Sequence, residues 1–281
     1  MSKTEFNDLL NAGCHFGHLK RKWNPAMAPY IFDEKKGIHI IDLNKTIGKL
    51  DQASAAMKNL AKSGKKILFV ATKKQAKEIV SAKAKEVNMP YVTERWSGGM
   101  LTNFATIRKA VKKMSAIDKM HTDGTIETLS KRERLQLTRT RAKLEKNLGS
   151  ISDLNRLPHA IFIVDIMKEH IAVAEANKLG VTSFGIVDTN SDPREVDFAI
   201  PANDDATKSI AMIMDVVCGA IKEGLDERGK EKEAAKAAEE EAKAKAEAAK
   251  AEKAEKAAEA AKAEKVAEEP AAEAKEAKGK E

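Results

Sequence analysis

The chain has 281 residues, with 50 Lys and Arg against 43 Asp and Glu, and a formal net charge of +7 at pH 7. This length is enough for one large or two small domains with a sizeable core. Cys14 and Cys218 are too far apart in the sequence for a disulfide framework or a paired-cysteine zinc site, and the apolar stretches are only strand-length, so we expect a soluble, cytoplasmic protein without signal peptide or membrane span.

The elements predicted along the chain alternate between short apolar strands and amphipathic helices. Strands that are apolar on both faces and alternate with helices are typical of a parallel sheet covered on both sides. We therefore predict a flavodoxin-like, doubly wound α/β fold. In chain order, we expect an edge or hairpin strand at 38–42, a helix at about 44–63, strands at 67–72, 91–96, 160–166, 181–188 and 198–200, and helices at 75–85, 169–179 and 204–223.

A basic window interrupts this alternation. Residues 104–149 hold 12 Lys or Arg against 5 Asp or Glu, and two apolar series recur there at helical spacing. A turn at 121–124 and a capping box formed by Ser130 and Glu133 would separate two antiparallel helices. Narrow apolar seams with wide basic faces indicate a coiled-coil hairpin inserted at 104–151. The two series are Ile107, Val111, Met114 and Ile117, then Leu137, Leu144, Leu148 and Ile151.

The C-terminal segment 229–281 has a different composition. It contains 21 Ala, 13 Lys and 15 Glu, with no aromatic residue, so it cannot build a core and should be a solvated helix or disordered. Without it, residues 1–228 have 37 basic and 28 acidic residues, a net charge of +9. We therefore expect a globular domain at 1–103 and 152–228, the hairpin at 104–151, and this tail. The concentrated charge is typical of a polyanion binder, although a solubilising surface helix pair would look similar.

The nine residues 95–103 combine a cation, an aromatic ring and two glycines where a predicted strand meets a helix. Glycines allow close approach of the main chain or a positive φ, and a helix start favours an anion. Arg95 could bind phosphate and Trp96 could stack on a base. The alternative is a tight turn in which Trp96 belongs to the core.

The run Lys20 to Asn24 mixes cations with Trp23 and is followed by Pro25 and Pro29. The prolines favour an irregular, extended segment, which could lie along RNA. Trp23 could stack on a base, or it could anchor the segment to the sheet.

Several short motifs, taken together and in order, resemble the bacterial small-subunit ribosomal protein S2 family. The similarity extends from about residue 5 to about residue 225. The motifs are AGCHFGH at 12–18, WNP at 23–25, IHIIDL at 38–43, ILFVATK at 67–73, RWSGGMLTN at 95–103, IVDTNSDP at 186–193 and IPANDDA at 200–206.

The resemblance implies a structural, non-catalytic constituent of the small ribosomal subunit that acts in translation. It implies 16S rRNA as a partner, a late-assembling position between the head and body of the subunit, and docking of the OB-repeat ribosomal protein that loads mRNA. No membrane, small-molecule substrate or cofactor is expected. The candidate RNA-binding residues are Lys20, Arg21, Trp23, Lys73, Lys74, Arg95, Trp96, Arg108, Lys109, Lys112, Lys113, Arg132, Arg134, Arg139 and Arg141.

Two alternative functions remain open at this point. A nucleotide-using enzyme would need a small-molecule site at Lys73, Arg95 and Asp188, but no Walker loop, nucleophile elbow or dinucleotide motif is present. A protein scaffold whose basic hairpin binds acidic partners is a further alternative.

Two groups of residues could in principle hold a metal. The imidazoles of His15 and His18, three residues apart, could lie on one face of a helix as metal ligands. The aspartates at 188, 192, 204 and 205 could offer oxygen ligands. We interpret the histidines as packing or surface residues and the aspartates as turn and helix-cap residues, so no metal is assigned.

Overall fold

The computed structural model describes residues 6–233. Within them, residues 6–228 form the first compact unit, and a second unit begins at Gly229. The tail predicted at 229–281 lies outside the described residues, except for its first five residues, 229–233. The first unit contains both the α/β body and the basic helices, so the predicted boundary between them stays a prediction.

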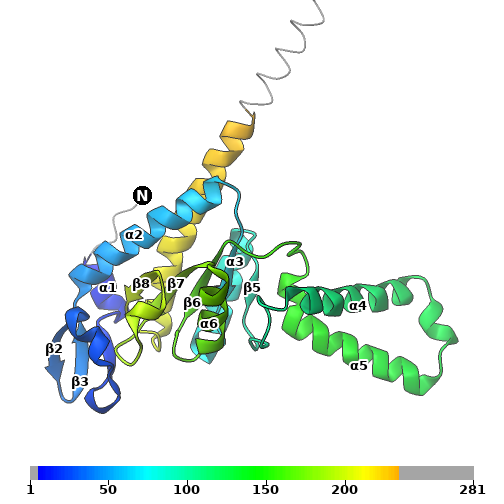
Figure 1. Ribbon diagram of the computed structural model, residues 1–281, viewed down its shortest axis with the longest axis horizontal. Helices are drawn as coiled ribbons and strands as arrows, with labels where there is room; N and C mark the ends of the chain where they lie inside the picture. The colour runs from blue at the N-terminus through cyan, green and yellow to red at the C-terminus, as the bar shows by residue number, and fades with distance from the viewer. Residues whose placement is uncertain (1–5, 234–281) are drawn as a thin grey trace, which may run out of the picture. The chain divides into compact units, whose positions relative to one another are not determined.

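Within residues 6–233, five parallel strands form the main sheet (Figure 1). Their spatial order is β5-β4-β6-β7-β8, which is the 2-1-3-4-5 order of the flavodoxin-like fold. The central strands are buried along their whole length, as the continuous apolar runs predict, and the fold class is confirmed. The strands are β4 (Ile67–Val70), β5 (Tyr91–Val92), β6 (Ala160–Val164), β7 (Thr182–Val187) and β8 (Phe198–Pro201).

Each face of this sheet has its own core. On one face, Phe69, Phe162 and Phe184 pack against α2 (Leu43–Lys62), α3 (Lys74–Glu86) and a last helix that begins at residue 207. The residues between them in the strands, such as Leu68 and Ile161, face the opposite side. There they pack with α6 (His170–Leu179) and with Trp96. This alternation follows from the two-residue repeat of a strand.

The last helix packs closely on α2 because of a glycine. A Cβ atom at Gly224 would fall well inside van der Waals contact of the Lys58 carbonyl oxygen and 3.1 Å from Ala61 Cβ. A side chain of any size at position 224 would therefore separate the two helices.

A second, antiparallel sheet near the N-terminus corrects one prediction. Strand β3 (Ile38–Ile41) forms a hairpin with β2 (Ile31–Lys35), so the hairpin alternative is correct. The edge alternative is wrong, because β3 lies at the centre of this second sheet, between β2 and β1 (Phe16–Leu19). A short helix α1 (Phe6–Ala12) precedes it. The sequence did not indicate β1 and β2, because their side chains are mostly polar or exposed and show no clear alternation.

The sequence predicts an extended segment after β1, and this prediction is wrong. It forms two 3-10 helices, η1 (Lys20–Lys22) and η2 (Pro25–Tyr30). The φ angle that proline fixes suits a helical turn, and the Asn24 side chain caps the second helix by accepting a hydrogen bond from the backbone N–H of Ala26 at 2.9 Å.

Residues 104–151, here called the arm, contain two helices that run in opposite directions (Figure 1). They are α4 (Phe104–Thr122) and α5 (Lys131–Leu148), joined through η3 (Thr125–Thr128), and η4 (Gly149–Ile151) follows. Met114, Ile117 and Ile126 are buried along the seam. The predicted capping box of Ser130 and Glu133 is confirmed. Supercoiling of these helices stays a prediction.

Some element boundaries differ from those predicted. Strand β5 ends at Val92 because the chain then leaves the sheet and turns toward α6. The last helix begins at 207 rather than 204, after a turn that directs two aspartates back toward the sheet. Another 3-10 helix, η5 (Pro193–Glu195), precedes β8. Among the described residues, no helix combines the length and the apolar character needed to cross a bilayer.

Candidate functional site

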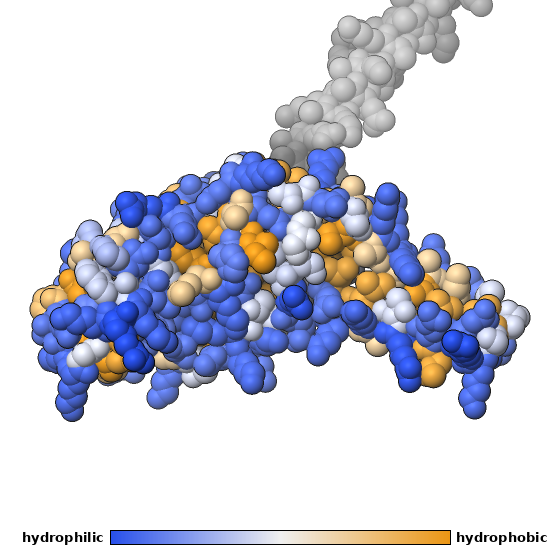
Figure 2. Space-filling model, turned by 60° about the horizontal axis from the view of Figure 1, so that its bottom comes forward, coloured by the Kyte–Doolittle hydropathy of each residue, from blue (hydrophilic) through white to orange (hydrophobic). Residues whose placement is uncertain are grey.

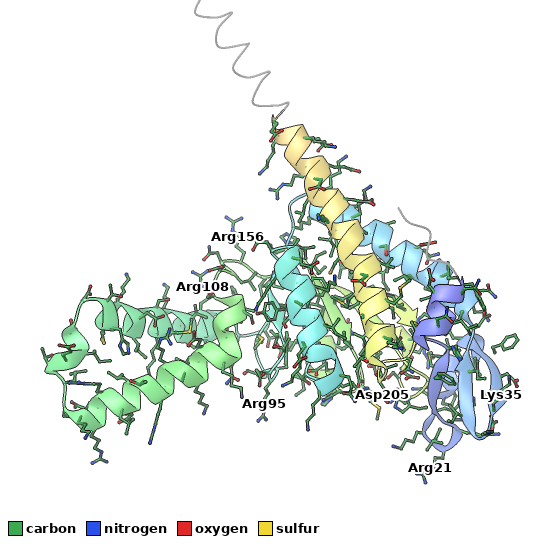
Figure 3. All side chains as sticks on the ribbon, turned by 180° about the vertical axis from the view of Figure 1, so that it is seen from behind. Arg21, Lys35, Arg95, Arg108, Arg156 and Asp205 are labelled. Atoms are coloured by element: carbon green, nitrogen blue, oxygen red, sulfur yellow. The ribbon has the colours of Figure 1, made fainter. Side chains whose placement is uncertain are left out.

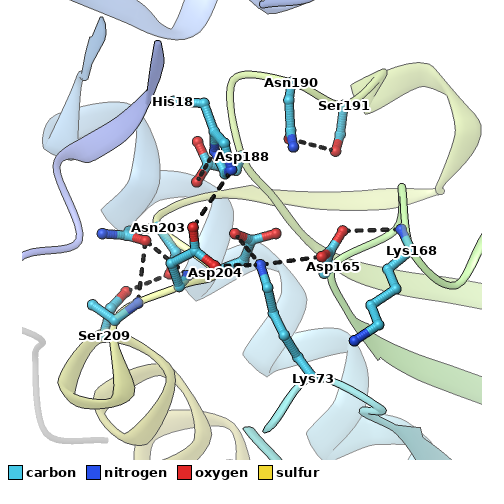
Figure 4. Close-up of polar contacts among 12 residues, drawn as sticks. His18, Lys73, Asp165, Lys168, Asp188, Asn190, Ser191, Asn203, Asp204 and Ser209 are labelled. Atoms are coloured by element: carbon cyan, nitrogen blue, oxygen red, sulfur yellow. Dashed lines mark hydrogen bonds and ion pairs between the residues drawn. The ribbon is translucent and has the colours of Figure 1, made fainter. Parts of the chain in front are cut away.

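Charged side chains converge where the parallel strands end (Figure 4). Lys73, which follows β4, reaches three carboxylates from later parts of the chain. Its Nζ lies 3.1 Å from Asp165 Oδ2, 2.8 Å from Asp204 Oδ1 and 2.7 Å from Asp205 Oδ1. Asp204 is fully buried, whereas Asp205 is about half exposed. One side of the cluster is therefore buried, and the other side is open to solvent.

This cluster corrects the assignment of Lys73 as an RNA-binding residue. Only 14% of its side chain is exposed, and its ammonium is already surrounded by carboxylates. Burial lowers the pKa of Lys73, but the hydrogen bonds and charges of Asp204, Asp205 and Asp165 together raise it more, so the net pKa lies above the ordinary value. The positive charge of Lys73 is used by these three carboxylates and is not available to a phosphate.

The same contacts occupy the crevice in which folds of this order bind small ligands. That crevice opens between β4 and β6, where the strand order reverses. Here the Lys73–Asp165 ion pair crosses it, and Thr72 Oγ1 donates a hydrogen bond to Glu169 beside it. Burial raises the pKa of Glu169. Internal pairs therefore take the place that a nucleotide would need.

The segment 95–103 does bind an anion, but the anion belongs to the protein. The carboxylate of Glu175, on α6, is buried under this turn and accepts hydrogen bonds from its backbone and side chains. Gly99 takes φ +85° there, as expected for a glycine turn. The donors are Trp96 Nε1 at 3.2 Å, the N–H groups of Gly99 at 2.7 Å, Leu101 at 2.9 Å and Thr102 at 3.0 Å, and Thr102 Oγ1 at 3.1 Å.

Trp96 is therefore a core residue, and its assignment as a base-stacking residue is corrected. Only 6% of it is exposed, and its indole N–H is used by Glu175. Burial raises the pKa of Glu175, but the N–H groups of Thr102, Leu101 and Gly99 and the Trp96 indole lower it more, so the pKa lies below the usual range. Glu175 stays ionised and holds the turn on α6.

Sequence reasoning missed Glu175, although a signal for it exists. The residue lies on the same face of the predicted helix as the small apolar residues Ala172 and Ala176, where a charge is out of place. A carboxylate on an apolar helix face needs donors, and the glycine turn offers several.

Other cations at this edge of the body are exposed. Lys74 and Arg95 are both open to solvent, and neither pairs with a carboxylate within the part of the chain that the structure describes. In Figure 3, Arg95 and Arg21 project from the same edge of the body. Lys20 is exposed but pairs with Glu34 at 2.7 Å.

Trp23 is partly buried and partly exposed, so it has features of both roles that the sequence left open, an anchor and a stacking residue. It is 36% exposed and packs at 5.2 Å, ring centre to ring centre, against His39. One part of the indole anchors the 3-10 segment to β3, and the other is open to a partner.

The predicted cations of the arm fall into two groups. Three are engaged in contacts within the protein, and the others are exposed and make no ion pair with another described residue. On the face shown in Figure 2, hydrophilic side chains project along the arm beside a broken strip of hydrophobic ones. The exposed group is Lys109, Lys112, Lys113, Arg132 and Arg139.

The engaged group holds the arm together. Arg141 pairs with Asp118 across the two helices and with Glu145 at 2.7 Å, and Asp118 raises the pKa of Arg141. Arg134 donates to the Glu127 carbonyl at 3.0 Å. At the base of the arm, Arg108 donates to the Asn155 carbonyl at 2.6 Å, close to Arg156 in Figure 3.

The two histidines do not form a pair. His15 packs at a tilt against the ring of Phe16, with ring centres 4.0 Å apart, whereas His18 faces the aspartate cluster, with Nδ1 2.9 Å from Asp188 Oδ2. The cap interpretation is correct for Asp192, which accepts from the backbone N–H of Arg194 at 3.0 Å. It is incomplete for Asp188 and wrong for Asp204, whose carboxylate faces Lys73.

A hollow of about 500 Å³ lies beside the antiparallel sheet. Its apolar lining is unusually exposed: Phe6 is 43%, Phe16 is 50% and Phe32 is 75% accessible to solvent. Several exposed aromatic rings around one hollow are typical of a contact surface for another macromolecule.

Comparisons with known proteins agree on one family. The sequence model of "Ribosomal protein S2" matches residues 9–224. The chain is 69% identical to "Small ribosomal subunit protein uS2" of Phocaeicola vulgatus over 242 residues, which cover 86% of this chain and 87% of the relative. It is 69% identical to the same protein of Bacteroides thetaiotaomicron over 240 residues (85% and 86%), and 66% identical to that of Flavobacterium johnsoniae over 239 residues (85% and 94%).

Proposed function

The chain belongs to the ribosomal protein S2 family, and from that membership we propose that its basic arm and one edge of its body bind 16S rRNA. As a member of this family it is a structural constituent of the small ribosomal subunit, with a role in translation that is not enzymatic. Assembly into a bacterial ribosome places it in the cytoplasm.

The observation that carries the proposal is the exposed cation group of the arm. Lys109, Lys112, Lys113, Arg132 and Arg139 meet no carboxylate partner among the described residues, so they are available to phosphates. The arm is narrow and can lie in a groove between RNA helices. Lys74, Arg95 and Arg21 extend this surface onto the body. Lys73 and Trp96 are left out, because both are used inside the protein.

Recognition should depend on the path of the phosphates and not on base sequence. Lys side chains bind phosphate as point charges, and Trp23 is the one candidate stacking residue among those predicted that stays partly exposed. Phosphate contacts position a protein on RNA without reading sequence. Each such contact adds about 0.7 to 0.9 to the slope of log affinity against log salt.

The test is charge reversal on the arm. Lys112→Glu/Lys113→Glu should lower affinity for 16S rRNA and incorporation into reconstituted subunits, and should reduce the salt slope by about 1.4 to 1.8, with an unchanged melting temperature. The matched control is Lys208→Glu/Lys222→Glu, two exposed lysines on the last helix with the same change of charge. Equal losses in both variants would refute a specific role of the arm.

We further propose that the apolar hollow near the N-terminus contacts a neighbouring ribosomal protein, and that this neighbour is the OB-repeat protein that loads mRNA. The support is the exposure of Phe16 and Phe32, since RNA binding does not require phenylalanines around an apolar hollow. Phe16→Ser/Phe32→Ser should release this neighbour from purified subunits and leave 16S rRNA affinity intact. Loss of rRNA affinity instead would assign the hollow to RNA.

A scaffold that binds acidic proteins through the arm is the competing function. Nuclease treatment separates the two, because complexes held by RNA dissociate when the RNA is degraded, whereas complexes with acidic proteins survive.

A further inference from the structure

A second hollow, here called the base hollow, lies at the amino ends of the central main-sheet strands. It measures about 380 Å³, which is within the range of roughly 300–1,000 Å³ that small-molecule sites occupy. Its walls come from the turn before β4, the turn before β5 and the segment 150–159, which returns from the arm to β6. The base hollow therefore lies where the arm joins the body, at the opposite ends of the strands from the ion pairs of Lys73.

The base hollow is lined by apolar side chains at two depths. Met89 and Leu154 are almost completely buried, whereas Leu157 is 38% exposed. An apolar lining with a few polar groups is usual for sites that bind small organic groups. Leu157 is therefore positioned to contact the flat face of such a group.

Positive charge surrounds the base hollow. Lys66 and Arg156 line it and are exposed, and Arg156 makes no ion pair with another described residue. Arg228 adds a third cation, because its guanidinium packs against the lining residue Gly64. Asp153 is the only acid among the lining residues. The rim of the base hollow is therefore suited to phosphate groups.

Arg108 links the base hollow to the arm. From α4 it donates to the carbonyl oxygen of Asn155 at 2.6 Å and to Asn155 Oδ1 at 3.0 Å. The side-chain amide of Asn155 keeps its NH₂ group as a free donor. The amide of Asn88 and the imidazole of His159 also line the base hollow, and neither side chain has a hydrogen-bond partner among the described residues. The edge of an unpaired base can hydrogen-bond to groups of this kind.

The lining favours RNA over protein as the occupant. Three exposed phenylalanines surround the hollow near the N-terminus, whereas no Phe, Tyr or Trp lines the base hollow, and cations and amides do. Unpaired bases of RNA stack on guanidinium planes, and Arg156 offers such a plane. RNA that follows the arm also reaches the base hollow, because segment 150–159 continues directly from α5.

We propose that the base hollow binds one unpaired nucleotide of the rRNA, with its base against Leu157 and its phosphates on Lys66 and Arg156. This inference rests on the proposed RNA binding and adds a second contact surface to it. Arg156 and Arg95 lie at opposite edges of the body (Figure 3), so RNA would contact the base of the arm from two sides. The shape of the base hollow would hold the base with little preference for its identity.

The experiment titrates the full chain with 16S rRNA at several salt concentrations. Leu157→Ser removes an apolar contact with the base and should weaken affinity by about 5- to 20-fold at every salt concentration, with an unchanged salt slope. Arg156→Gln removes a phosphate contact and should lower the slope by about 0.7 to 0.9. The matched controls are Leu179→Ser and Lys222→Gln, at exposed positions that do not line the base hollow, and they should behave as the parent does.

Chemical probing of the rRNA bases gives a second measurement. The parent should protect one unpaired base that folded Leu157→Ser leaves reactive, while protection along the arm is the same in both. Circular dichroism establishes that each variant is folded.

Parent-like affinity and base protection in Leu157→Ser would overturn the proposal. If Lys112→Glu/Lys113→Glu still weakens binding in that case, the arm binds RNA without the base hollow. A parent chain with no affinity for rRNA would overturn the proposed function and this proposal together. Release of a neighbouring protein from purified subunits by Leu157→Ser, with unchanged rRNA affinity, would assign the base hollow to protein and refute the proposal.

Discussion

The indole N–H of Trp96 donates to Glu175 Oε1 at 3.2 Å, and this contact turns an apparent anion site into a structural joint. The glycine turn offers several N–H donors in one direction, which is how proteins bind phosphates. Because Glu175 fills that position from α6, the turn is fixed to the body at the base of the arm. The exposed neighbour Arg95 remains available to RNA.

Replacement of Glu175 by Gln should destabilise the protein by roughly 2–4 kcal/mol. The amide keeps the size but loses the charge, and its NH₂ group would face backbone donors. Unfolding by urea, followed by tryptophan fluorescence, measures the change. Glu195→Gln alters an exposed glutamate and should have almost no effect. A Glu175→Gln protein as stable as the parent would show that the joint contributes little.

The pH dependence of stability gives a second test of the same joint. The folded pKa of Glu175 lies below its unfolded value of about 4.3. Its contribution is therefore complete above the unfolded pKa and is lost as the pH falls through the folded pKa. The stability difference between the parent and Glu175→Gln should be constant near neutral pH and narrow below about pH 4.3. A difference that does not change down to acid unfolding would contradict the assignment.

The neighbouring lysines 73 and 74 should behave in opposite ways. Lys73→Met leaves Asp165 and Asp204 without their cation and should cost about 3–5 kcal/mol of stability, because a broken buried pair leaves uncompensated charge. Lys74→Met removes an exposed charge, so it should keep the melting temperature and weaken rRNA binding. Calorimetric unfolding and rRNA titration of both variants check this, and a stable Lys73→Met protein with weak rRNA binding would reverse the two roles.

The contrast between these lysines shows what the sequence could predict. The main-sheet strands were predictable because residues such as Phe69 and Phe162 lie in uninterrupted apolar runs, which have few alternatives to a buried parallel strand. The charge excess of the arm was predictable because it depends on composition alone. The role of Lys73 was not predictable, since its partner Asp204 is 131 positions away.

Trp96 was missed for the same reason, because Glu175 lies 79 positions further along the chain. A cation and an aromatic ring beside a glycine turn have the same local appearance whether their partner is RNA or another helix. The antiparallel sheet was missed for a different reason. Strand β1 is short and combines Phe16 and Leu19, both exposed, with Gly17 and His18, so its pattern carries no periodic signal.

The packing of α2 against the last helix predicts opposite effects for two glycines of that helix. Gly224→Ala would press a methyl group into the Lys58 carbonyl, and backbone displacement of this kind costs about 1–3 kcal/mol. At position 219, no atom lies within 4 Å of an added Cβ, so Gly219→Ala should stabilise the helix by roughly 0.5–1 kcal/mol. Thermal unfolding of the two variants should therefore shift in opposite directions. If both alanines raise the melting temperature, helix propensity alone governs this segment, and the close contact with α2 is not maintained in solution.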